Sequence, residues 1–267
     1  MGALHSGHLS LIGRARAECD RVAVSVFVNP TQFDDPADLA AYPRRLEHDL
    51  EAARRAGADL VFAPEPEELY PPGFSTYVTV EGLGERFEGA VRGPGHFRGV
   101  ATVVLKLLNL VRPTVLYLGR KDAQQVALLK RMVRDLNLPV AIAVCPTVRD
   151  ADGLALSSRN ERLSPEERRR AASLYRALQA GAAAAAAGER EAAAVVAAAR
   201  QVLAEAGIEP EYLALVEEER FEELERLDRP ALLIVAARFG GTRLIDNVPL
   251  QPVAAAAAQR TEAICNG

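Results

Sequence analysis

The sequence predicts an α/β fold in which a doubly wound parallel sheet is followed by a smaller α+β domain. In the first part of the chain, short β-branched runs such as RVAVSVFVN alternate with longer segments whose apolar residues recur at helical spacing. This alternation is typical of strand–helix–strand crossovers. After residue 147, two alanine-rich segments precede three strand-like runs. We therefore expect two domains, at residues 1–147 and 148–267, of which the second closes over a site on the first.

The elements of the first domain are expected from the spacing of apolar residues and from β-branched runs. In chain order they are a helix at 9–19, a strand at 21–29, a helix at 43–56, a strand at 58–63, a short edge strand at 76–80, an apolar helix at 100–110, a strand at 114–118, a helix at 123–136 and a strand at 139–145. Residues 89–99 (GAVRGPGHFRG) are too rich in glycine for regular structure, and we expect a mobile loop over a site there.

The second domain begins with a polar segment at 147–162, which we expect to be a hinge or an active-site loop. Ser164 and Pro165 have the residue types of a helix N-cap and of the first helical position. The expected elements are helices at 165–180 and 189–206 and strands at 212–216, 231–239 and 242–246, the last two joined as a hairpin through Gly240 and Gly241.

The composition argues against several classes of protein. Apolar residues make up 49% and charged residues 25% of the chain, as in ordinary globular proteins. The net charge of −4 and the pI near 5.7 give no support to nucleic-acid binding. No apolar run is long enough to cross a bilayer, and three widely separated cysteines argue against a disulfide framework. We expect a cytoplasmic protein that acts on small molecules.

The opening octapeptide, MGALHSGH, is the stretch that most directly indicates function. It leads into the expected helix at 9–19, so His5 and His8 lie about one turn apart on one face of a helix N-terminus. Unpaired backbone N–H groups and the helix dipole attract phosphate to such an end. Gly2 and Gly7 have no Cβ and allow a ligand to approach the backbone closely. The octapeptide therefore predicts a nucleotide-binding turn.

Two other interpretations of the histidine pair stay open at this point. The pair has the spacing of half a zinc site, but no third ligand stands nearby and Cys19 lies at the far end of the helix, so we predict no metal-ligating cluster. The histidines are also compatible with ordinary surface residues near a chain end.

A phosphate-binding turn of this kind normally follows a buried parallel strand. No strand stands ahead of the octapeptide in residues 1–267. We therefore expect the first strand of the sheet to be an apolar, β-rich segment upstream of Met1.

Two later stretches also carry phosphate-binding residue types. Gly119-Arg120-Lys121-Asp122 follows the strand expected at 114–118, and Leu156-Ser157-Ser158-Arg159 lies in the polar segment. Lysine binds phosphate as a point charge, whereas arginine offers a fork of donors. Each stretch alone is equally well a charged helix start or a solvated loop, and Asp122 suits either a helix cap or a ribose hydroxyl. Together with the opening turn they indicate a nucleoside triphosphate.

Four blocks, MGALHSGH, VFVNPTQF, LGRKDAQQ and LSSRN, occur in this order. Together they resemble the pantothenate synthetase family, the AMP-forming pantoate–β-alanine ligases, within the wider HxGH nucleotidylyltransferase-like superfamily. The resemblance covers residue 1 to about residue 250 and implies a Rossmann-like first domain. The departure from the family is the absent first strand.

The resemblance implies roles for particular residues. His5, His8, Lys121 and Arg159 are expected to be catalytic, with His8 matching the proton donor. Gln32 and Gln125 match residues that hold pantoate, and Gln32 also lies near β-alanine, while Asn29, Met1 and Tyr42 are weaker candidates for the same pocket. The implied ATP contacts are Met1, Gly2, Ala3, Leu4, His5, Ser6, Gly7, His8, Gly119, Arg120, Lys121, Asp122, Val148, Leu156, Ser157, Ser158 and Arg159.

The implied reaction has two steps, in which pantoate and ATP form an acyl-adenylate and β-alanine then displaces AMP, with Mg²⁺ on the phosphates. A homodimer is expected, with the helix at 100–110 or the strand at 76–80 contributing to it. Residues 89–99 or 150–159 are candidates for a lid that excludes water. The rival functions are a nucleotidylyltransferase that modifies a phosphorylated acceptor, and a nucleotide-sensing protein without chemistry.

Overall fold

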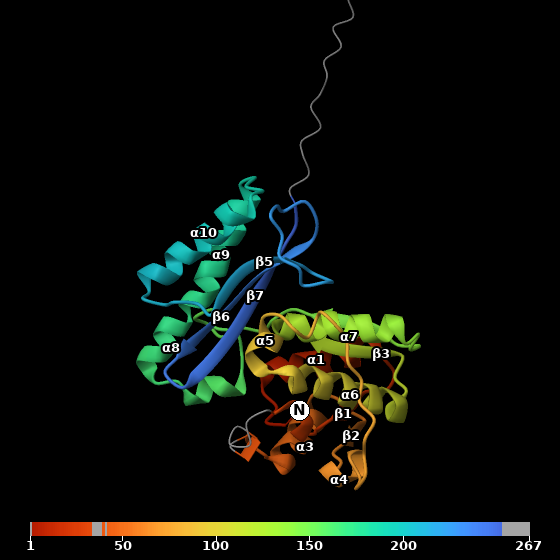
Figure 1. Cartoon of the computed structure of the whole chain (residues 1–267). Coiled ribbons are helices and arrows are strands. Elements are labelled where there is room, and N and C mark those ends of the chain that lie inside the picture. The colour runs from red at the N-terminus through yellow and green to blue at the C-terminus, as the bar shows by residue number, and fades with distance from the viewer. Residues whose placement is uncertain (1, 34–38, 41, 253–267) are drawn as a thin grey trace, which may run out of the picture.

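The computed structural model describes residues 2–33, 39–40 and 42–252, which fold into two parts (Figure 1). The first part holds the strands β1 (Ala23–Ser25), β2 (Leu60–Phe62), β3 (Val115–Gly119) and β4 (Ala141–Cys145). Its helices are α1 (Ser6–Glu18), α3 (Leu46–Arg55), α4 (Pro66–Leu69), α5 (Glu88–Arg92), α6 (Pro94–Val111) and α7 (Ala123–Asp135), with the short 3₁₀ turns η1 (Pro30–Gln32) and η2 (Arg120–Asp122).

The second part is an antiparallel sheet with helices on one side (Figure 1). Its strands are β5 (Tyr212–Glu217), β6 (Ala231–Phe239) and β7 (Thr242–Leu250), and its helical elements are η3 (Ser158–Arg162), α8 (Pro165–Ala171), α9 (Ser173–Ala186) and α10 (Ala192–Glu205). The expected hairpin at Gly240 and Gly241 is confirmed, since Phe239 pairs with Thr242 across it. The capping role of Ser164 is also confirmed, since its side chain accepts a hydrogen bond from the backbone N–H of Glu167.

The strands of the first part form two separate parallel pairs. β1 pairs with β2 and β3 pairs with β4. The predicted α/β class, with parallel strands first and a smaller antiparallel unit after them, is confirmed. Among the described residues the two pairs do not join into the one continuous sheet that we expected.

A cavity of about 750 Å³ lies between the two strand pairs. Its walls are mostly apolar and come from β1, β2, β3 and α6, with Val24, Phe62, Leu107 and Leu116 among them. The cavity thus separates the two strand pairs and is bounded by side chains of β1, β2, β3 and α6.

The glycine-rich stretch at 89–99 is helical, so the expectation of a mobile loop there is wrong. α5 and the first turn of α6 occupy it, joined at Gly93, which has a φ of 87°. The glycines permit close packing: a Cβ on Gly89 would collide with the carbonyl of Gly84, and one on Gly99 with the carbonyl of Thr31. The segment is thus glycine-rich because backbone meets backbone there.

The edge strand expected at 76–80 is also not formed. The segment has no regular secondary structure and pairs with no strand among the described residues. Its backbone instead contacts α6, where the N–H of Val78 donates to Oγ1 of Thr102 at 3.0 Å. An alternating sequence therefore lies along a helix here, because its apolar residues Val78 and Val80 pack into the core beside α6.

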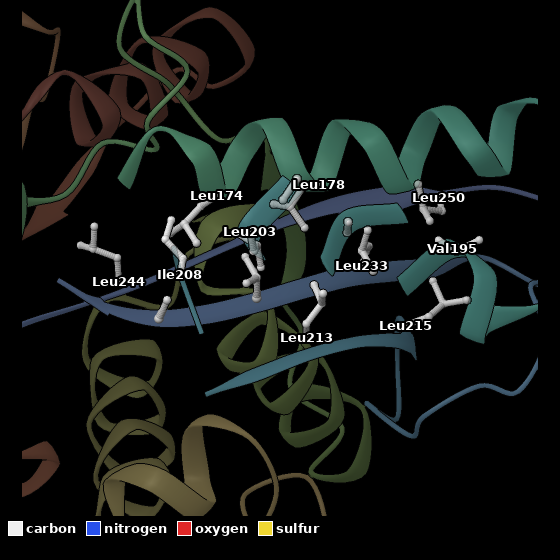
Figure 2. Packing of buried hydrophobic residues seen from close by; sticks show 14 of the residues in the cluster. Leu174, Leu178, Val195, Leu203, Ile208, Leu213, Leu215, Leu233, Leu244 and Leu250 are labelled. Carbon is white, nitrogen blue, oxygen red and sulfur yellow. The ribbon is translucent and has the colours of Figure 1, made fainter. Parts of the chain in front are cut away.

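The sheet of the second part is apolar on both faces. On one face Leu213, Leu215 and Leu233 pack against Leu178 and Leu203 of the helices (Figure 2). On the other face Ala214, Val216, Leu232 and Ile234 join a cluster that contains Leu128, Leu129 and Met132 of α7. The second part therefore packs on the first through a shared hydrophobic core. The division into two domains, at residues 1–147 and 148–267, stays a prediction.

Candidate active site

The N-terminus of α1 places the two histidines side by side. His5 is the N-cap, its Nδ1 accepting a hydrogen bond from the N–H of Gly7 at 3.2 Å, and its own N–H donates to Nδ1 of His8 at 3.3 Å. The ring centroids are 4.0 Å apart. Gly7 is required for this arrangement, because a Cβ there would lie 2.9 Å from the His5 ring. The octapeptide therefore forms a capping box made of imidazoles.

Both histidines are neutral donors toward the cleft. Burial, followed by repulsion from His5, lowers the pKa of His8 from 6.5 to about 3, and burial followed by the charge of Lys121 lowers the pKa of His5. Because each Nδ1 accepts a backbone hydrogen bond, the remaining proton of each neutral ring sits on Nε2. Two Nε2–H groups are thus available to a phosphate oxygen.

The neutrality of His8 gives a pH prediction. The Cε1–H signal of His8 is expected to stay flat between about pH 5 and 8 in NMR spectra, with the signal assigned through His8→Gln. The pKa of His8 is lower in the folded protein than in the unfolded chain. The neutral ring therefore contributes fully to the free energy of unfolding above about pH 6.5, and this contribution is lost as the pH falls toward about 3. A midpoint near 6.5 in the folded protein would contradict the removal of this ring from water.

A buried aspartate holds the backbone ahead of the histidines. The N–H groups of Ala3 and Leu4 donate to the two carboxylate oxygens of Asp49 at 2.8 and 2.7 Å, and Asp49 is fully buried. These N–H groups are therefore not free to bind phosphate. Sequence reasoning missed Asp49, although a charged residue on the same helix face as Ala52 and Ala53 was a usable signal.

The cleft lies where three parallel strands end. Gln32 follows the carboxyl end of β1, Lys121 that of β3 and Val148 that of β4. Open α/β sheets bind ligands at this edge. Lys121 Nζ is 3.6 Å from Oδ1 of Asp122, whereas Arg120 pairs with Glu218 of the second part at 3.1 Å.

Asp122 is an ionised carboxylate that lies among the cations of the cleft. Burial acts to raise its pKa, but the charges of Lys121, Arg92 and Arg159 outweigh burial and lower the pKa below its usual value. The opposite effect is seen at Arg92, whose pKa is lowered first by burial and next by repulsion from Arg159. Crowding of like charge on this scale favours a bound polyanion.

The polar segment after β4 is an ordered wall of the cleft. The N–H of Leu156 donates to the carbonyl of Val148 at 3.0 Å, closing a hairpin. Ser157 then caps η3, its hydroxyl accepting from the N–H of Arg159 at 3.3 Å. The hairpin and cap together bring Arg159 to the cleft.

Asn29 positions Gln32 and does not line the cleft itself. It is buried, and its Nδ2 donates to Oε1 of Gln32 at 3.2 Å and to the carbonyl of Gly99 at 3.1 Å. Its Oδ1 accepts from the hydroxyl of Tyr70 at 2.9 Å. Gln32 and Gln125, in contrast, both line the cleft.

The cleft has a volume of about 200 Å³. The residues expected at the site that line it are His5, Gly7, His8, Gln32, Tyr42, Gly119, Lys121, Asp122, Gln125, Val148, Leu156, Ser157, Ser158 and Arg159. The expected residues that do not line it are Gly2, Ala3, Leu4, Ser6, Arg120 and Asn29, and Met1 lies outside the described residues.

Several residues of the cleft were missed. Arg92 ends α5 and His96 lies in the first turn of α6, in the stretch that we expected to be a loop, and the break at Gly93 brings the Arg92 guanidinium to 3.4 Å from the His96 ring. Glu88 and Arg243 meet in a bidentate pair at 2.8 and 2.7 Å across 155 residues of sequence. No local pattern indicates a contact of that separation.

Two negative findings hold for the described part of the chain. It contains no group of three or more His, Cys, Asp or Glu side chains arranged to hold a metal ion. None of its helices is long and apolar enough to cross a bilayer.

The strand ends, the neutral histidine pair and the surrounding cations define a nucleotide-binding α/β protein of the HxGH type. A family comparison narrows this class: the Pantoate-beta-alanine ligase family matches residues 1–249. The chain belongs to the pantoate–β-alanine ligase family.

Individual relatives agree. A pantothenate synthetase of Chloroflexus aggregans is 55% identical over 92% of this chain and 90% of the relative, and one of Acidobacterium capsulatum is 54% identical over 96% and 86%. The crystal structure of pantothenate synthetase from Thermus thermophilus matches with a TM-score of 0.90 and 50% identity over 94% of this chain and 91% of that one. Pantoate-beta-alanine ligase from Francisella tularensis, complexed with Beta-gamma ATP and Beta-alanine, has a TM-score of 0.75 and 36% identity over 93% and 86%.

Proposed function

We propose that this chain condenses pantoate with β-alanine to pantothenate at the expense of ATP. A carboxylate oxygen of pantoate attacks the α-phosphorus of ATP and pyrophosphate leaves, giving pantoyl-adenylate. The amine nitrogen of β-alanine then attacks the acyl carbon, AMP leaves, and the amine loses its proton. The observation that supports this best is the single cleft in which the histidine pair, Lys121 and Arg159 stand together with Gln32 and Gln125.

Stabilisation of charge on the phosphates is the main task of the first step. The Nε2–H groups of His5 and His8, at the N-terminus of α1, would donate to phosphate oxygens, and Lys121 and Arg159 would add full positive charges. His8 is proposed as the donor at the reacting phosphate; as a neutral ring it offers a hydrogen bond, not an acidic proton.

Mg²⁺ is proposed as an accompanying ion that neutralises the pyrophosphate. Mg²⁺ usually takes one or two carboxylates and completes its shell with phosphate oxygens and water. Asp122 is the ionised carboxylate that lines the cleft beside Lys121 and fits that role.

The two glutamines suit a hydroxy acid that carries a carboxylate and hydroxyl groups but no phosphate. A primary amide donates to a carboxylate or hydroxyl and accepts from a hydroxyl, so Gln32 and Gln125 can hold pantoate, and Gln32 also β-alanine. A nucleotidylyltransferase that modifies a phosphorylated acceptor has no need of such a pair. The hairpin that carries Leu156 and Arg159 is proposed as the wall that keeps water from the adenylate between the steps.

The two half-reactions separate this function from its rivals. ATP with pantoate is expected to release about one pyrophosphate per active site and then stop, since the adenylate stays bound; AMP is expected only after β-alanine is added. Pyrophosphate that appears without pantoate, or AMP that never appears, would contradict the proposal. A nucleotide-sensing protein would bind ATP and release neither product.

A homodimer in the cytoplasm is the proposed form of the protein. α6 leaves Leu110 and Val111 exposed, at 60% and 37%, and these apolar side chains are candidates for a subunit contact. The segment at 76–80 is a weaker candidate, because it offers no strand edge. Sedimentation equilibrium of the purified chain gives the mass directly, and a monomer at micromolar concentration would contradict the proposal.

A further inference from the structure

Asn247 of β7 reaches out of the second part and contacts the turn that carries Lys121. Its Nδ2 donates to the carbonyl oxygens of Arg120 and Lys121, both at 3.0 Å, and the residue is 3% exposed. Two carbonyls accept from the amide, so Nδ2 must face them and the orientation of the side chain is fixed. Its Oδ1 has no hydrogen-bond donor among the described residues. The contact therefore depends on the two donors.

Asn247 is itself held from behind by a buried ion pair. Asp246 accepts the backbone N–H of Asn247 at 2.7 Å and is held by both terminal nitrogens of Arg149, at 2.5 and 2.9 Å. The Arg149 guanidinium also stacks 3.7 Å above the ring of Tyr175 on α9. A chain of contacts therefore links the Asn247 amide through Asp246 and Arg149 to Tyr175 on α9.

The lysine depends on its backbone for its position. Its side chain lies beside Asp122, and at 3.6 Å that pair is too long for a hydrogen bond. A lysine side chain has several rotatable bonds, so the location of its Cα determines which region Nζ can reach. The Cα of Lys121 lies in the three-residue turn η2, whose carbonyls Asn247 binds.

We propose that Asn247 is a positioning residue that fixes the Lys121 turn and so couples the antiparallel sheet to the nucleotide cleft. The role rests on the proposed function, in which Lys121 contacts the phosphates of ATP. Asn247 acts through the turn and is not a catalytic residue.

The first test observes the lysine without any chemistry. The chain has three lysines, Lys106, Lys121 and Lys130, so reductive ¹³C-methylation gives three side-chain signals that Lys→Arg variants assign. Asn247→Ala is expected to shift and broaden the Lys121 signal and to leave the other two in place. Asn109→Ala, at an exposed asparagine of α6, is the matched control and is expected to move none. An unmoved Lys121 signal in Asn247→Ala overturns the proposal.

The second test asks whether Asn247 acts through Lys121. Asn247→Ala is expected to slow pyrophosphate release from ATP and pantoate by roughly 10–100-fold, with a urea midpoint that shows the variant is folded. In a Lys121→Ala background the same substitution is expected to change the rate by less than about 2-fold, since both changes remove one interaction. Equal losses in the two backgrounds would overturn the proposal.

The two tests distinguish failure of the inference from failure of the proposed function. A Lys121 signal that moves in a protein that never releases pyrophosphate keeps the positioning role and refutes the ligase function. Pyrophosphate release with an unmoved signal keeps the ligase function and refutes the positioning role. Should Asn247→Ala fail to fold, Asn247→Leu, which keeps about the size of the side chain and removes both donors without adding a charge, replaces it with the same expected signal shift.

Discussion

Lys121→Ala is expected to lower pyrophosphate release from ATP and pantoate by roughly 10²–10³-fold. Lys121 lines the cleft with a side chain that is 21% exposed, and in the proposed mechanism its ammonium stabilises the charge that develops on the departing phosphates. The fold is expected to survive, because the ammonium makes no short hydrogen bond that the structure records. The measurement is the single-turnover rate of pyrophosphate formation at saturating ATP.

Lys130→Ala is the control for this substitution. Lys130 lies on α7, nine residues after Lys121, and does not line the cleft. Its loss is expected to leave the rate unchanged. A Lys121→Ala enzyme that forms pyrophosphate as fast as the Lys130→Ala enzyme would remove Lys121 from the proposed mechanism.

Arg243→Ala is expected to destabilise the fold by about 3–5 kcal/mol, because it removes the main partner of a buried carboxylate. Glu88 is 7% exposed, and Arg243 holds both of its oxygens. Tyr212 donates a further hydrogen bond at 2.8 Å, and the Nε of Arg92 lies 3.3 Å away. These two partners remain in the variant, so the lower half of the range is expected. Urea unfolding at neutral pH measures the loss.

Arg238 provides the matched control. Both arginines contact Glu211, but Arg238 is 57% exposed and Arg243 only 12%. An exposed pair contributes about 0–1 kcal/mol, so Arg238→Ala is expected to change the free energy of unfolding by no more than that. Equal losses in the two variants would show that burial of Glu88 does not govern its energetics.

The sequence predicted the elements whose signals are local. Ser164 and Pro165 marked the start of α8, and the glycine pair at 240–241 marked the hairpin between β6 and β7. Each of these signals depends on residues within a few positions of one another. A helix N-cap and a two-residue hairpin turn require the same residue types in any fold.

Local signals of this kind did not predict how segments pack against one another. The glycines of 89–99 looked like breaks in structure, yet Gly89 and Gly99 are there because α5 and α6 press against Gly84 and Thr31. The same composition describes a mobile loop and a tightly packed helix start. The backbone against which the glycines pack decides between a mobile loop and a helix start, and the local sequence pattern does not show which backbone that is.

The sequence motifs predicted which side chains line the cleft better than they predicted which backbone N–H groups face it. The side chains of His5, His8, Lys121 and Arg159 all line the cleft as expected. Residues 2–4 of the same motif do not line the cleft, and Asp49 accepts the N–H groups of Ala3 and Leu4. A motif that spans a turn has residues on both sides of it, and sequence alone does not say which side faces the ligand.

The cavity between the two strand pairs bears on how the first part unfolds. β1–β2 and β3–β4 share no backbone hydrogen bond among the described residues, so only side chains and helices link them. Local unfolding occurs in cooperative units that often coincide with supersecondary motifs, so we expect the two strand pairs to open with separate free energies. Gln32 comes after β1 of the first pair, and Lys121 comes after β3 of the second pair. The spacing between the two pairs therefore helps to set the geometry of the cleft, and amide hydrogen exchange is expected to show two transitions, one for each pair.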